Sequence, residues 1–351
     1  MRKLISYMVF WGVFLALSSC IQEDLDKCFS GIRLKFHFDL HEEGLEGTMK
    51  SVHVFLFDTD SVLRVVQEGK GDCLVHNFTM NMDVSPGTYT LVAFGCDDTD
   101  FYHSYNDGHI SEQVAGKYDA GVTIGKTTLS DLRIFLKSNL SGSGETEQRV
   151  PAAKTFDDLF YGISGIRQKA TSEYEVKEVV VPQQTIVDQD IDLIRNTSVL
   201  KLTVRGVKKL HSGGVANIDI YALGTNDCYT WHNRLAGMAG KIKFLPDNIS
   251  FGDDSLQLDI RVQRLEYSRT VSPVILYLCD KTTGAKRYEL DVVKTLLQAK
   301  DGEGRYIYSD QEDIDRIYNH PIDLLFDDNE GKLVIRIFVQ GWEVKNIYPV
   351  M

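Results

Sequence analysis

The sequence predicts an all-β protein made of two tandem β-sandwich domains with minor helical pieces. Many short segments alternate apolar and polar residues with a period of two, which is typical of strands with one buried face. Turn residues separate these segments with little helical periodicity between them, and this arrangement favours sandwiches. The chain has 351 residues, which is long for one domain and sufficient for two.

The chain begins with the features of a lipoprotein signal peptide. Arg2 and Lys3 are basic, residues 4–17 are mostly apolar, and the small residues Ser18 and Ser19 precede Cys20. We expect removal of residues 1–19 as a signal peptide and attachment of a diacylglyceryl group to the thiol of Cys20. An ordinary signal peptide with a chance cysteine, or a signal anchor, is the alternative.

Lipidation of Cys20 predicts a soluble body tethered to a membrane through residues 20–30. The acidic residues Glu23, Asp24 and Asp26 resemble the export tag of surface lipoproteins in Bacteroides-type bacteria, which implies exposure on the outer membrane, and a solvated linker is the alternative. Each buried methylene group contributes about 0.8 kcal/mol, so two or three acyl chains give a lasting membrane anchor. Loss of residues 1–19 removes two positive charges, so the formal net charge changes from −12 to −14. Such an acidic body argues against nucleic acid as a partner.

The first domain is expected over residues 31–139. Ile32, Leu34 and Phe36 alternate with polar residues and predict its first strand. Pro86 and Gly87 favour a turn, because Pro fixes φ and Gly reaches φ above zero. The predicted strands of this domain are residues 32–39, 51–57, 62–66, 89–94 and 132–137.

Residues 140–149 are the predicted linker, because this part of the chain (NLSGSGETEQ) is rich in Gly, Ser and Glu and lacks apolar periodicity. The second domain is expected over residues 150–351. Short helical pieces are predicted at residues 156–161, 291–299 and 309–318. The predicted strands are residues 179–182, 198–205, 218–223, 241–245, 257–262, 273–279, 287–290, 321–326 and 332–339.

Five cysteines follow the lipidation site, namely Cys28, Cys73, Cys96, Cys228 and Cys279. None forms a CxxC pair, so no zinc or thioredoxin-like motif is indicated. An oxidising envelope permits a disulfide bond in each half, and Cys228 with Cys279 is the one choice within the second half. Buried thiols are the alternative interpretation.

The sequence contains no motif that predicts catalysis, a cofactor or a metal site. Residues 121–127 (GVTIGKT) resemble a phosphate loop but have one residue too few before the Gly-Lys pair. Asp97, Asp98, Asp100 and Asp107 lie in a segment whose spacing matches no EF-hand, so a solvated acidic loop is favoured over a calcium site. We therefore expect a protein that is not an enzyme and has no cofactor.

Several motifs follow one another along the chain: the lipobox, the CIQEDLDKC tether, GIRLKFHFD, VHVFLFDTDSVLRVV, PGTYTLVAFG, YLCDKTTG and VIRIFVQGWEV. In this order they resemble the FimB-like group of fimbrillin-associated anchor lipoproteins of Bacteroides-type bacteria. The resemblance implies two transthyretin-like β-sandwich domains and a minor fimbrial subunit that holds a pilus on the outer membrane. It also implies fimbrial (pilin) subunits as partners. Stalk subunits of the family are cut after an arginine, and residues 20–31 contain Lys27 but no arginine, which suits an anchor.

We thus predict a non-enzymatic outer-membrane lipoprotein that is an anchor or minor subunit of a fimbria. A surface glycan-binding lipoprotein of a polysaccharide uptake system is the alternative. Tyr229, Trp231 and Trp342 are the candidate aromatic residues for stacking on sugars. Aromatic residues more often fill cores, which is the plainer interpretation of all three.

The C-terminal segment is the candidate subunit contact. Residues 332–339 are expected to close the second domain's own sheet rather than pair with another subunit. Beyond Gly341, the apolar residues Val344, Ile347, Tyr348 and Val350 predict contact with a partner. Strand addition is the expected mode, because an unpaired strand edge offers N–H and C=O groups to another chain.

Overall fold

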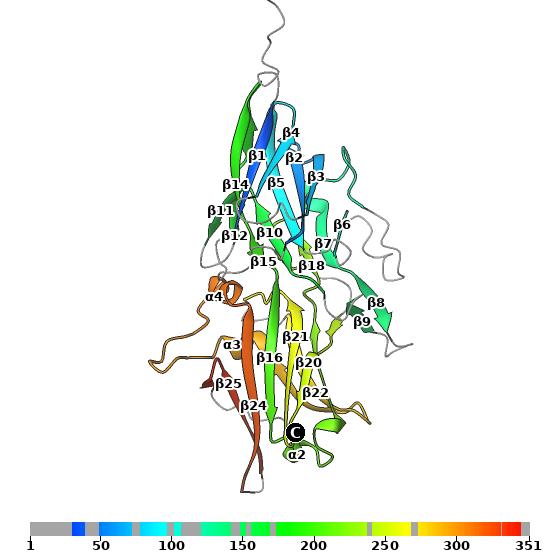
Figure 1. The fold of residues 1–351 in the computed structure, drawn as a ribbon, viewed down its shortest axis with the longest axis vertical. Helices are drawn as coiled ribbons and strands as arrows, with labels where there is room; N and C mark the ends of the chain where they lie inside the picture. The colour runs from blue at the N-terminus through cyan, green and yellow to red at the C-terminus, as the bar shows by residue number, and fades with distance from the viewer. Residues whose placement is uncertain are drawn as a thin grey trace, which may run out of the picture.

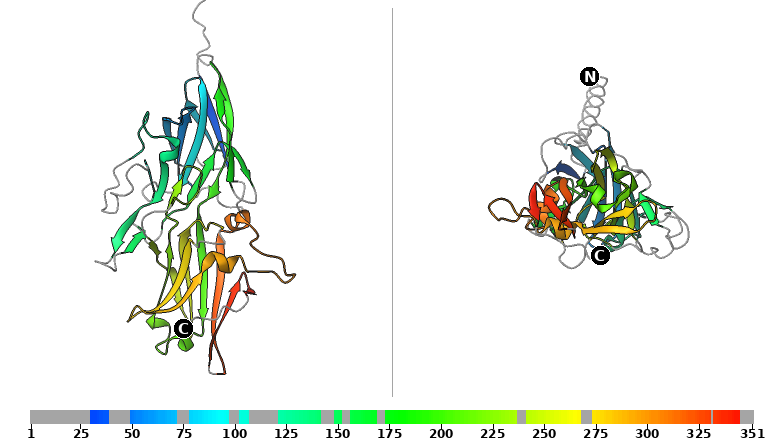
Figure 2. Two further views of the ribbon diagram at one scale, coloured as in Figure 1. Left: turned by 180° about the vertical axis from the view of Figure 1, so that it is seen from behind. Right: turned by 90° about the horizontal axis from the view of Figure 1, so that it is seen from below.

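The computed structural model describes residues 30–38, 49–71, 78–96, 102–106, 121–141, 148–151, 156–168, 173–236, 241–267, 273–330 and 332–344. Their regular structure is mostly β-strand, which confirms the predicted all-β class. Two sets of sheets follow one another along the long axis of an elongated molecule (Figure 1), and Figure 2 shows the same arrangement from behind. No helix within these ranges is long and apolar enough to span a membrane.

The N-terminal sandwich has two facing sheets. Its strands are β1 (Gly31–His37), β2 (Ser51–Asp58), β3 (Leu63–Lys70), β4 (Thr79–Asp83), β5 (Gly87–Cys96), β10 (Leu159–Ile163), β13 (Val179–Val181), β14 (Ile186–Asp192) and β15 (Ile194–Arg195). The smaller sheet has the order β14-β1-β4. The larger sheet has the order β15-β10-β5-β2-β3, with β13 also paired to β5.

The alternation in β1 explains how this sandwich is filled. Ile32, Leu34 and Phe36 are buried between the sheets, whereas Arg33 and Lys35 are partly exposed. β1 pairs with β4 in antiparallel orientation along one edge and with β14 in parallel orientation along the other. The first strand after residue 30 is therefore held on both edges.

The C-terminal sandwich consists of two six-stranded sheets. The β16 sheet contains β16 (Thr197–Arg205), β20 (Asp247–Phe251), β21 (Ser255–Gln263), β24 (Asn319–Asn329), β25 (Lys332–Val339) and β26 (Trp342–Val344). The β17 sheet contains β8 (Ser138–Ser141), β9 (Gln148–Pro151), β17 (Ile218–Gly224), β19 (Ile242–Phe244), β22 (Val274–Asp280) and β23 (Lys286–Asp291). Their orders are β20-β21-β16-β24-β25-β26 and β23-β22-β17-β19-β9-β8.

The remaining elements are short. They are β6 (Tyr102–Asn106), β7 (Leu132–Leu136), β11 (Gly165–Gln168), β12 (Glu173–Val176), β18 (Cys228–Thr230), the helices α2 (Val207–Leu210), α3 (Val292–Leu296) and α4 (Gln311–Arg316), and the 3-10 turns η6 (Leu129–Asp131) and η8 (Val215–Asn217). α3 and α4 confirm two of the predicted helical pieces. Asp291 caps α3, because its carboxylate accepts a hydrogen bond from Lys294 N at 3.0 Å.

The strand pairings differ from the predicted division of the chain at residues 140–149. β8 and β9, which flank that segment, pair with each other, and β9 pairs with β19 in the β17 sheet. β10, β13, β14 and β15 come later in the chain, yet they pair with strands of the N-terminal sandwich. The chain thus reaches the C-terminal sandwich at β8 and β9, returns to the N-terminal sandwich at β10, and passes to the C-terminal sandwich again after β15. The polar composition of residues 140–149 indicates local exposure and carries no information on these long-range pairings.

The predicted helical piece at residues 156–161 is wrong, because most of it lies in or next to β10. All five residues of β10 are buried. Leu159 and Tyr161 belong to one apolar cluster, and Phe160 belongs to the other. A strand that is buried on both faces reads as a continuous apolar run, which periodicity cannot distinguish from a buried helix.

An ionic network centred on Asp158 joins the two sandwiches. Asp158 Oδ1 accepts hydrogen bonds from Thr197 Oγ1 at 2.6 Å, Arg261 Nη1 at 2.6 Å and Tyr318 Oη at 3.2 Å. The Arg195 guanidinium lies 3.9 Å from the centre of the Tyr318 ring. Burial, together with the nearby charge of Asp158, raises the pKa of Tyr318 to about 12, so this phenol remains a donor at neutral pH.

Candidate functional site: an apolar groove in the C-terminal sandwich

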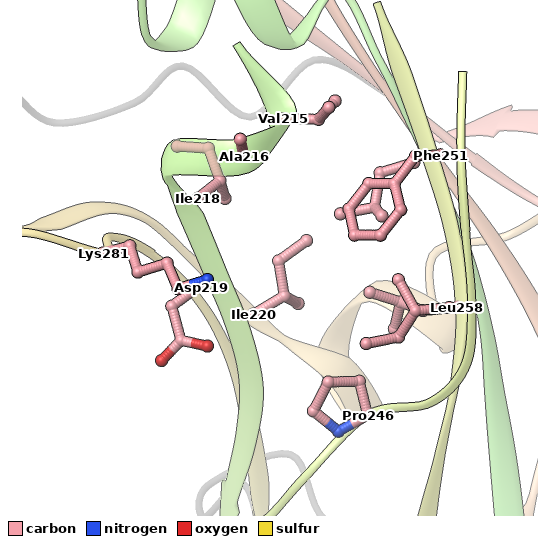
Figure 3. Close-up of a pocket in the computed structure, with 11 residues that line it drawn as sticks. Val215, Ala216, Ile218, Asp219, Ile220, Pro246, Phe251, Leu258 and Lys281 are labelled. Atoms are coloured by element: carbon pink, nitrogen blue, oxygen red, sulfur yellow. The ribbon is translucent and has the colours of Figure 1, made fainter. Parts of the chain in front are cut away.

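An apolar groove opens between the two sheets of the C-terminal sandwich (Figure 3). Ile218 and Ile220 of β17 form one side, and Leu258 of β21 forms the other. Leu256 of β21 also lines the groove. Phe251 of β20 stands at the rim. The groove has a volume of about 380 Å³, which is within the range of small ligand pockets.

The chain closes both ends of the groove. At one end lie Val215 and Ala216 of η8, and at the other lies Pro246 (Figure 3). Pro246 lies where the chain leaves β19 in the β17 sheet and crosses to β20 in the β16 sheet. Because η8 follows α2, the groove is at the α2 end of the molecule, far from the end where β1 begins (Figure 1).

One edge of β17 has an unpaired segment beside the groove. β22 pairs with all seven residues of β17, from Ile218 to Gly224. β19 pairs on the other edge with Ala222, Leu223 and Gly224 alone. Among the described strands, none pairs with that edge at residues 218–221. Alternate residues of this segment therefore direct backbone N–H and C=O groups toward an edge at which no described strand pairs with them.

β20 leaves apolar side chains uncovered at the same place. Phe251 is 64% exposed and Ile249 is 43% exposed, and both line the groove. Two residues apart on a strand, they share one face. By contrast, Leu256 and Leu258 behind them are each 3% exposed. Within the described ranges, no strand covers this inner face of the edge strand.

Charged residues flank the groove on the outer side of β17. Asp219 lies 3.7 Å from the Lys243 ammonium group, which also lies 3.9 Å from the centre of the Tyr221 ring. Lys281 also borders the groove, and its ammonium group forms no ion pair or hydrogen bond with the described residues. The pKa of Tyr221 is raised well above its usual range. Burial of the phenol is the larger cause, and the neighbouring Cys279 thiol is the second.

The turn before Lys281 is held in place by Asp280. The carboxylate of Asp280 accepts hydrogen bonds from the backbone N–H groups of Thr282 and Thr283 at 3.0 and 2.9 Å, and from Arg287 Nη2 at 3.0 Å. These hydrogen bonds hold the pKa of Asp280 well below its usual range, and the bond from the Thr283 backbone N–H has the largest effect. His211 Nε2 lies 2.9 Å from the same carboxylate, so the turn is fixed to the segment that leads into η8.

The predicted C-terminal contact residues divide into two groups. Lys332–Val339 is β25, which pairs with β24, and this confirms that the segment closes the chain's own sheet. Val344 is 1% exposed and opposite Ile337, so it packs in the chain's own core and its predicted role as a subunit contact is corrected. Ile347, Tyr348 and Val350 lie outside the described residues, as does Cys20.

Cys228 and Cys279 are thiols in the structure rather than a disulfide bond. Cys228 lies on β18, which pairs with β7, whereas Cys279 lies on β22 in the β17 sheet. The Cys279 thiol lies 3.6 Å from the Tyr221 hydroxyl. The suggested bridge is therefore replaced by the alternative of buried thiols, because the two cysteines belong to different sheets.

The three candidate sugar-stacking residues have different environments. Tyr229 is 1% exposed and belongs to the core. Trp231 is partly buried, and its carbonyl accepts a hydrogen bond from the Tyr161 hydroxyl at 3.0 Å. Trp342 is 45% exposed and packs over Gly302, where an added Cβ atom would come within 2.7 Å of the ring. Of the three, Trp342 alone is exposed.

The sequence did not indicate the groove. Three strands that line or border the groove, β17, β19 and β21, were predicted. β20 was missed, because Ile249 and Phe251 are the only apolar residues in this five-residue strand. The signal that could have been used is the pair of apolar residues two apart, next to Gly252 and Asp253. The unpaired edge of β17 at residues 218–221 could still not be predicted. It depends on where the chain crosses between the two sheets, and a local sequence pattern does not show this.

The sequence matches the family described as fimbrillin-A associated anchor proteins Mfa1 and Mfa2 over residues 25–348. No curated protein matches it.

Several solved structures share the fold. A candidate adhesin from Bacteroides ovatus is 23% identical, with a TM-score of 0.67 and coverage of 94% of this chain and 98% of that chain. A candidate polysaccharide-binding protein from Bacteroides thetaiotaomicron is 22% identical, with a TM-score of 0.67 and coverage of 91% and 98%. The fimbrial anchor protein Mfa2 from Porphyromonas gingivalis is 17% identical, with a TM-score of 0.61 and coverage of 90% and 99%.

Proposed function

The chain belongs to the family of fimbrillin-A associated anchor proteins, and from this membership we propose that it holds a fimbria on the bacterial surface. In this proposal it is a non-enzymatic outer-membrane lipoprotein whose lipid is attached to Cys20. Fimbrial subunits are its partners, and strand-type contacts join them to it. Residues 20–30 are the tether between the lipid and the first strand.

The observation that carries the proposal is the placement of two features at opposite ends of the molecule. β1 begins at one end, directly after residue 30, and the apolar groove lies near α2 at the other end (Figure 1). A lipid at Cys20 would hold the β1 end near the membrane. The groove and the unpaired edge of β17 would then face away from the membrane, where a fimbria extends.

The junction between the sandwiches suits a tethered anchor. Asp158 takes hydrogen bonds from Thr197, Arg261 and Tyr318, and its side chain is 11% exposed. Hydrogen bonds to a charged and largely buried acceptor are stronger than average. A force applied at the distal end would therefore pass to the tethered end through fixed contacts.

Substitution of the lipidated cysteine tests the proposal. Cys20→Ser removes the thiol that forms the thioether, so the protein should leave the membrane fraction and fimbriae should be shed into the medium. Cys28→Ser is the matched control, since it lies outside the lipobox and should leave both unchanged. Immunoblots of the membrane fraction and of shed fimbriae are the measurements. Wild-type fimbrial retention in Cys20→Ser cells would refute anchoring by this protein.

Glycan binding is the second candidate function, and the exposed face of Trp342 favours it. Sugars stack on such aromatic faces, and a related fold is described as a candidate polysaccharide-binding protein. Trp342→Ala should then abolish binding on a glycan array while the chain stays folded. Absence of binding by the wild-type protein would exclude this candidate on the glycans displayed.

A further inference from the structure

We propose that the side chains of Thr197 and Gln263 become joined by an ester bond, which the folded chain forms by itself with loss of ammonia. Thr197 is the first residue of β16, and Gln263 is the last residue of β21. Asp158 is the catalytic residue, because its carboxylate already holds the Thr197 hydroxyl. The ester links two neighbouring strands where the two sandwiches meet.

The first step is the pairing of the two residues. Thr197 and Gln263 are direct partners in the antiparallel ladder of β16 and β21. Directly opposite residues place their side chains on one face of the sheet, with Cβ atoms about 4.5–5.5 Å apart. The Gln263 side chain extends two carbon atoms beyond Cβ, so its amide carbon can reach the Thr197 hydroxyl.

The second step is the burial of the pair. Leu200 and Leu202 of β16 face the core of the C-terminal sandwich, so Thr197 lies on the outer face of the sheet. Asp158 lies against this face, and Thr197 and Gln263 are only 3% and 0% exposed. Exclusion of water protects an ester at this position from hydrolysis.

The third step is the proton acceptor. Asp158 Oδ1 accepts the hydrogen bond of Thr197 Oγ1 at 2.6 Å, which is the geometry of a base that takes the proton of an attacking hydroxyl. The same Oδ1 atom accepts a hydrogen bond from Arg261 Nη1 at 2.6 Å, so the guanidinium charge lies beside that hydroxyl. Arg261 also precedes Gln263 by two residues on the same face of β21. Its charge stabilises the negative charge that develops on the amide oxygen during the attack.

The reaction balances without any co-reactant. Thr197 Oγ1 attacks Cδ of Gln263, and the hydroxyl proton passes to Asp158. The tetrahedral intermediate then breaks its C–N bond, and the leaving nitrogen takes the proton from Asp158 and departs as ammonia. The products are one ester bond, one ammonia molecule and the original carboxylate of Asp158.

A second Thr–Gln pair on the same two strands is the matched control. Thr203 and Gln257 are also direct partners, and they lie on the same outer face. Gln257 is exposed and Thr203 is partly exposed, and the Thr203 hydroxyl donates to no carboxylate among the described residues. This pair has the same register but neither the base nor the burial, so it should remain unlinked.

The position of the link suits a chain under tension. The chain enters β16 directly from β15, at the junction between the sandwiches (Figure 1). An ester between the first residue of β16 and the last residue of β21 prevents the two strands from separating at this end. This mechanical consequence rests on the proposed function, because it assumes a load on an anchor, whereas formation of the ester does not.

Peptide mapping of the full-length protein by mass spectrometry tests the ester. Trypsin should release one branched peptide made of residues 196–201 and 262–264, which is lighter by one ammonia molecule than the two separate peptides together. Hydroxylamine should divide this peptide into its two parts, because it cleaves esters. Residues 202–205 and 244–261, which carry Thr203 and Gln257, should be recovered as separate peptides.

Substitutions test the role of each group. Gln263→Glu removes the amide that leaves as ammonia, and Thr197→Val removes the hydroxyl, so each should abolish the branched peptide. Thr197→Ser keeps a hydroxyl and should retain it, and Thr203→Val should leave it unchanged. Asp158→Asn removes the base, so ester formation followed over time after cell-free synthesis should be about 100-fold slower than in the wild type.

Recovery of the two peptides unlinked from the folded wild-type protein would overturn the inference. So would a branched peptide that persists in Gln263→Glu, or a wild-type rate of formation in Asp158→Asn. These results concern the ester alone. Retention of fimbriae by Cys20→Ser cells decides the anchor function separately, so the two proposals fail in different experiments.

Discussion

Arg264 and Asp315 form a two-point ion pair inside the protein. Arg264 Nε lies 2.7 Å from Asp315 Oδ1, and Arg264 Nη2 lies 2.7 Å from Oδ2. The two side chains are 6% and 0% exposed, and Gln311 Nε2 also donates to Asp315 Oδ1 at 2.8 Å. Because Arg264 follows β21 and Asp315 belongs to α4, the pair fixes this helix to the end of the β16 sheet.

Asp315→Ala should lower the free energy of unfolding by about 3–5 kcal/mol, because it leaves the Arg264 charge buried without its partner. Arg305→Ala is the control. Arg305 is 71% exposed in its pair with Asp301, so its loss should cost about 1 kcal/mol or less. Urea unfolding measures both. Equal losses in the two variants would show that the buried pair contributes no more than a surface pair.

Gly206→Ala should be more destabilising than Gly284→Ala, although the two glycines have nearly the same positive φ angle. Their φ angles are 71° and 70°. A Cβ atom at Gly206 would lie 2.0 Å from the carbonyl oxygen of Phe326, whereas one at Gly284 would meet nothing within 4 Å. Gly284→Ala should cost about 1–2 kcal/mol from backbone strain, and Gly206→Ala clearly more. Comparing the thermal unfolding midpoints of the two variants separates backbone strain from the steric clash. Equal midpoints for Gly206→Ala and Gly284→Ala would contradict a clash with the Phe326 carbonyl oxygen.

His320 should make the protein less stable as the pH falls. Burial lowers its pKa from 6.5 to about 3, and its Nδ1 lies 3.1 Å from the Tyr308 hydroxyl. A folded-state pKa below the unfolded one means that the stabilisation is complete above pH 6.5 and is lost as the pH falls toward 3. The slope is about 1.4 kcal/mol per pH unit for one such group.

Urea unfolding from about pH 7 to about pH 4 should show this dependence in the wild type and a weaker one in His320→Gln. His37→Gln is the control, because His37 is 44% exposed. Parallel pH profiles for wild type and His320→Gln would rule out a buried neutral histidine.

Alkylation should find Cys228 and Cys279 as thiols. Both are buried, so iodoacetamide should modify them only after denaturation, and without any reducing agent. Peptide mapping by mass spectrometry identifies the modified residues. A peptide pair joined through these two cysteines would instead restore the disulfide alternative.

The sequence predicted several of the strands in which one face is buried. Ile32, Leu34 and Phe36 show the period of two in β1, and β17 and β21 follow the same rule. It failed for β10, because that strand is buried on both faces and resembles a helix segment. The all-β class therefore followed from local pattern alone.

The long-range arrangement could not be predicted in the same way. β1 and β14 pair in parallel orientation although they are far apart in the sequence. The residues of either strand alone do not predict which strand it pairs with. Likewise, the sequence predicts that Val344 is exposed and available to a partner. In the structure, the hairpin of β25 and β26 places Val344 opposite Ile337. The groove depends on the crossing at Pro246, so it too required the folded chain.

The pairing of β1 has a mechanical consequence for a protein pulled at its N-terminal end. Tension that enters at residue 30 runs along β1, whose two neighbours are bonded to it over most of its length, Gly31 to His37 on β14 and Gly31 to Lys35 on β4. The ladders are then stressed in shear, so their hydrogen bonds share the force. A strand pulled sideways from a sheet edge would be unzipped one bond after another. Forced detachment is governed by the unfolding rate, and simultaneous rupture makes that rate low.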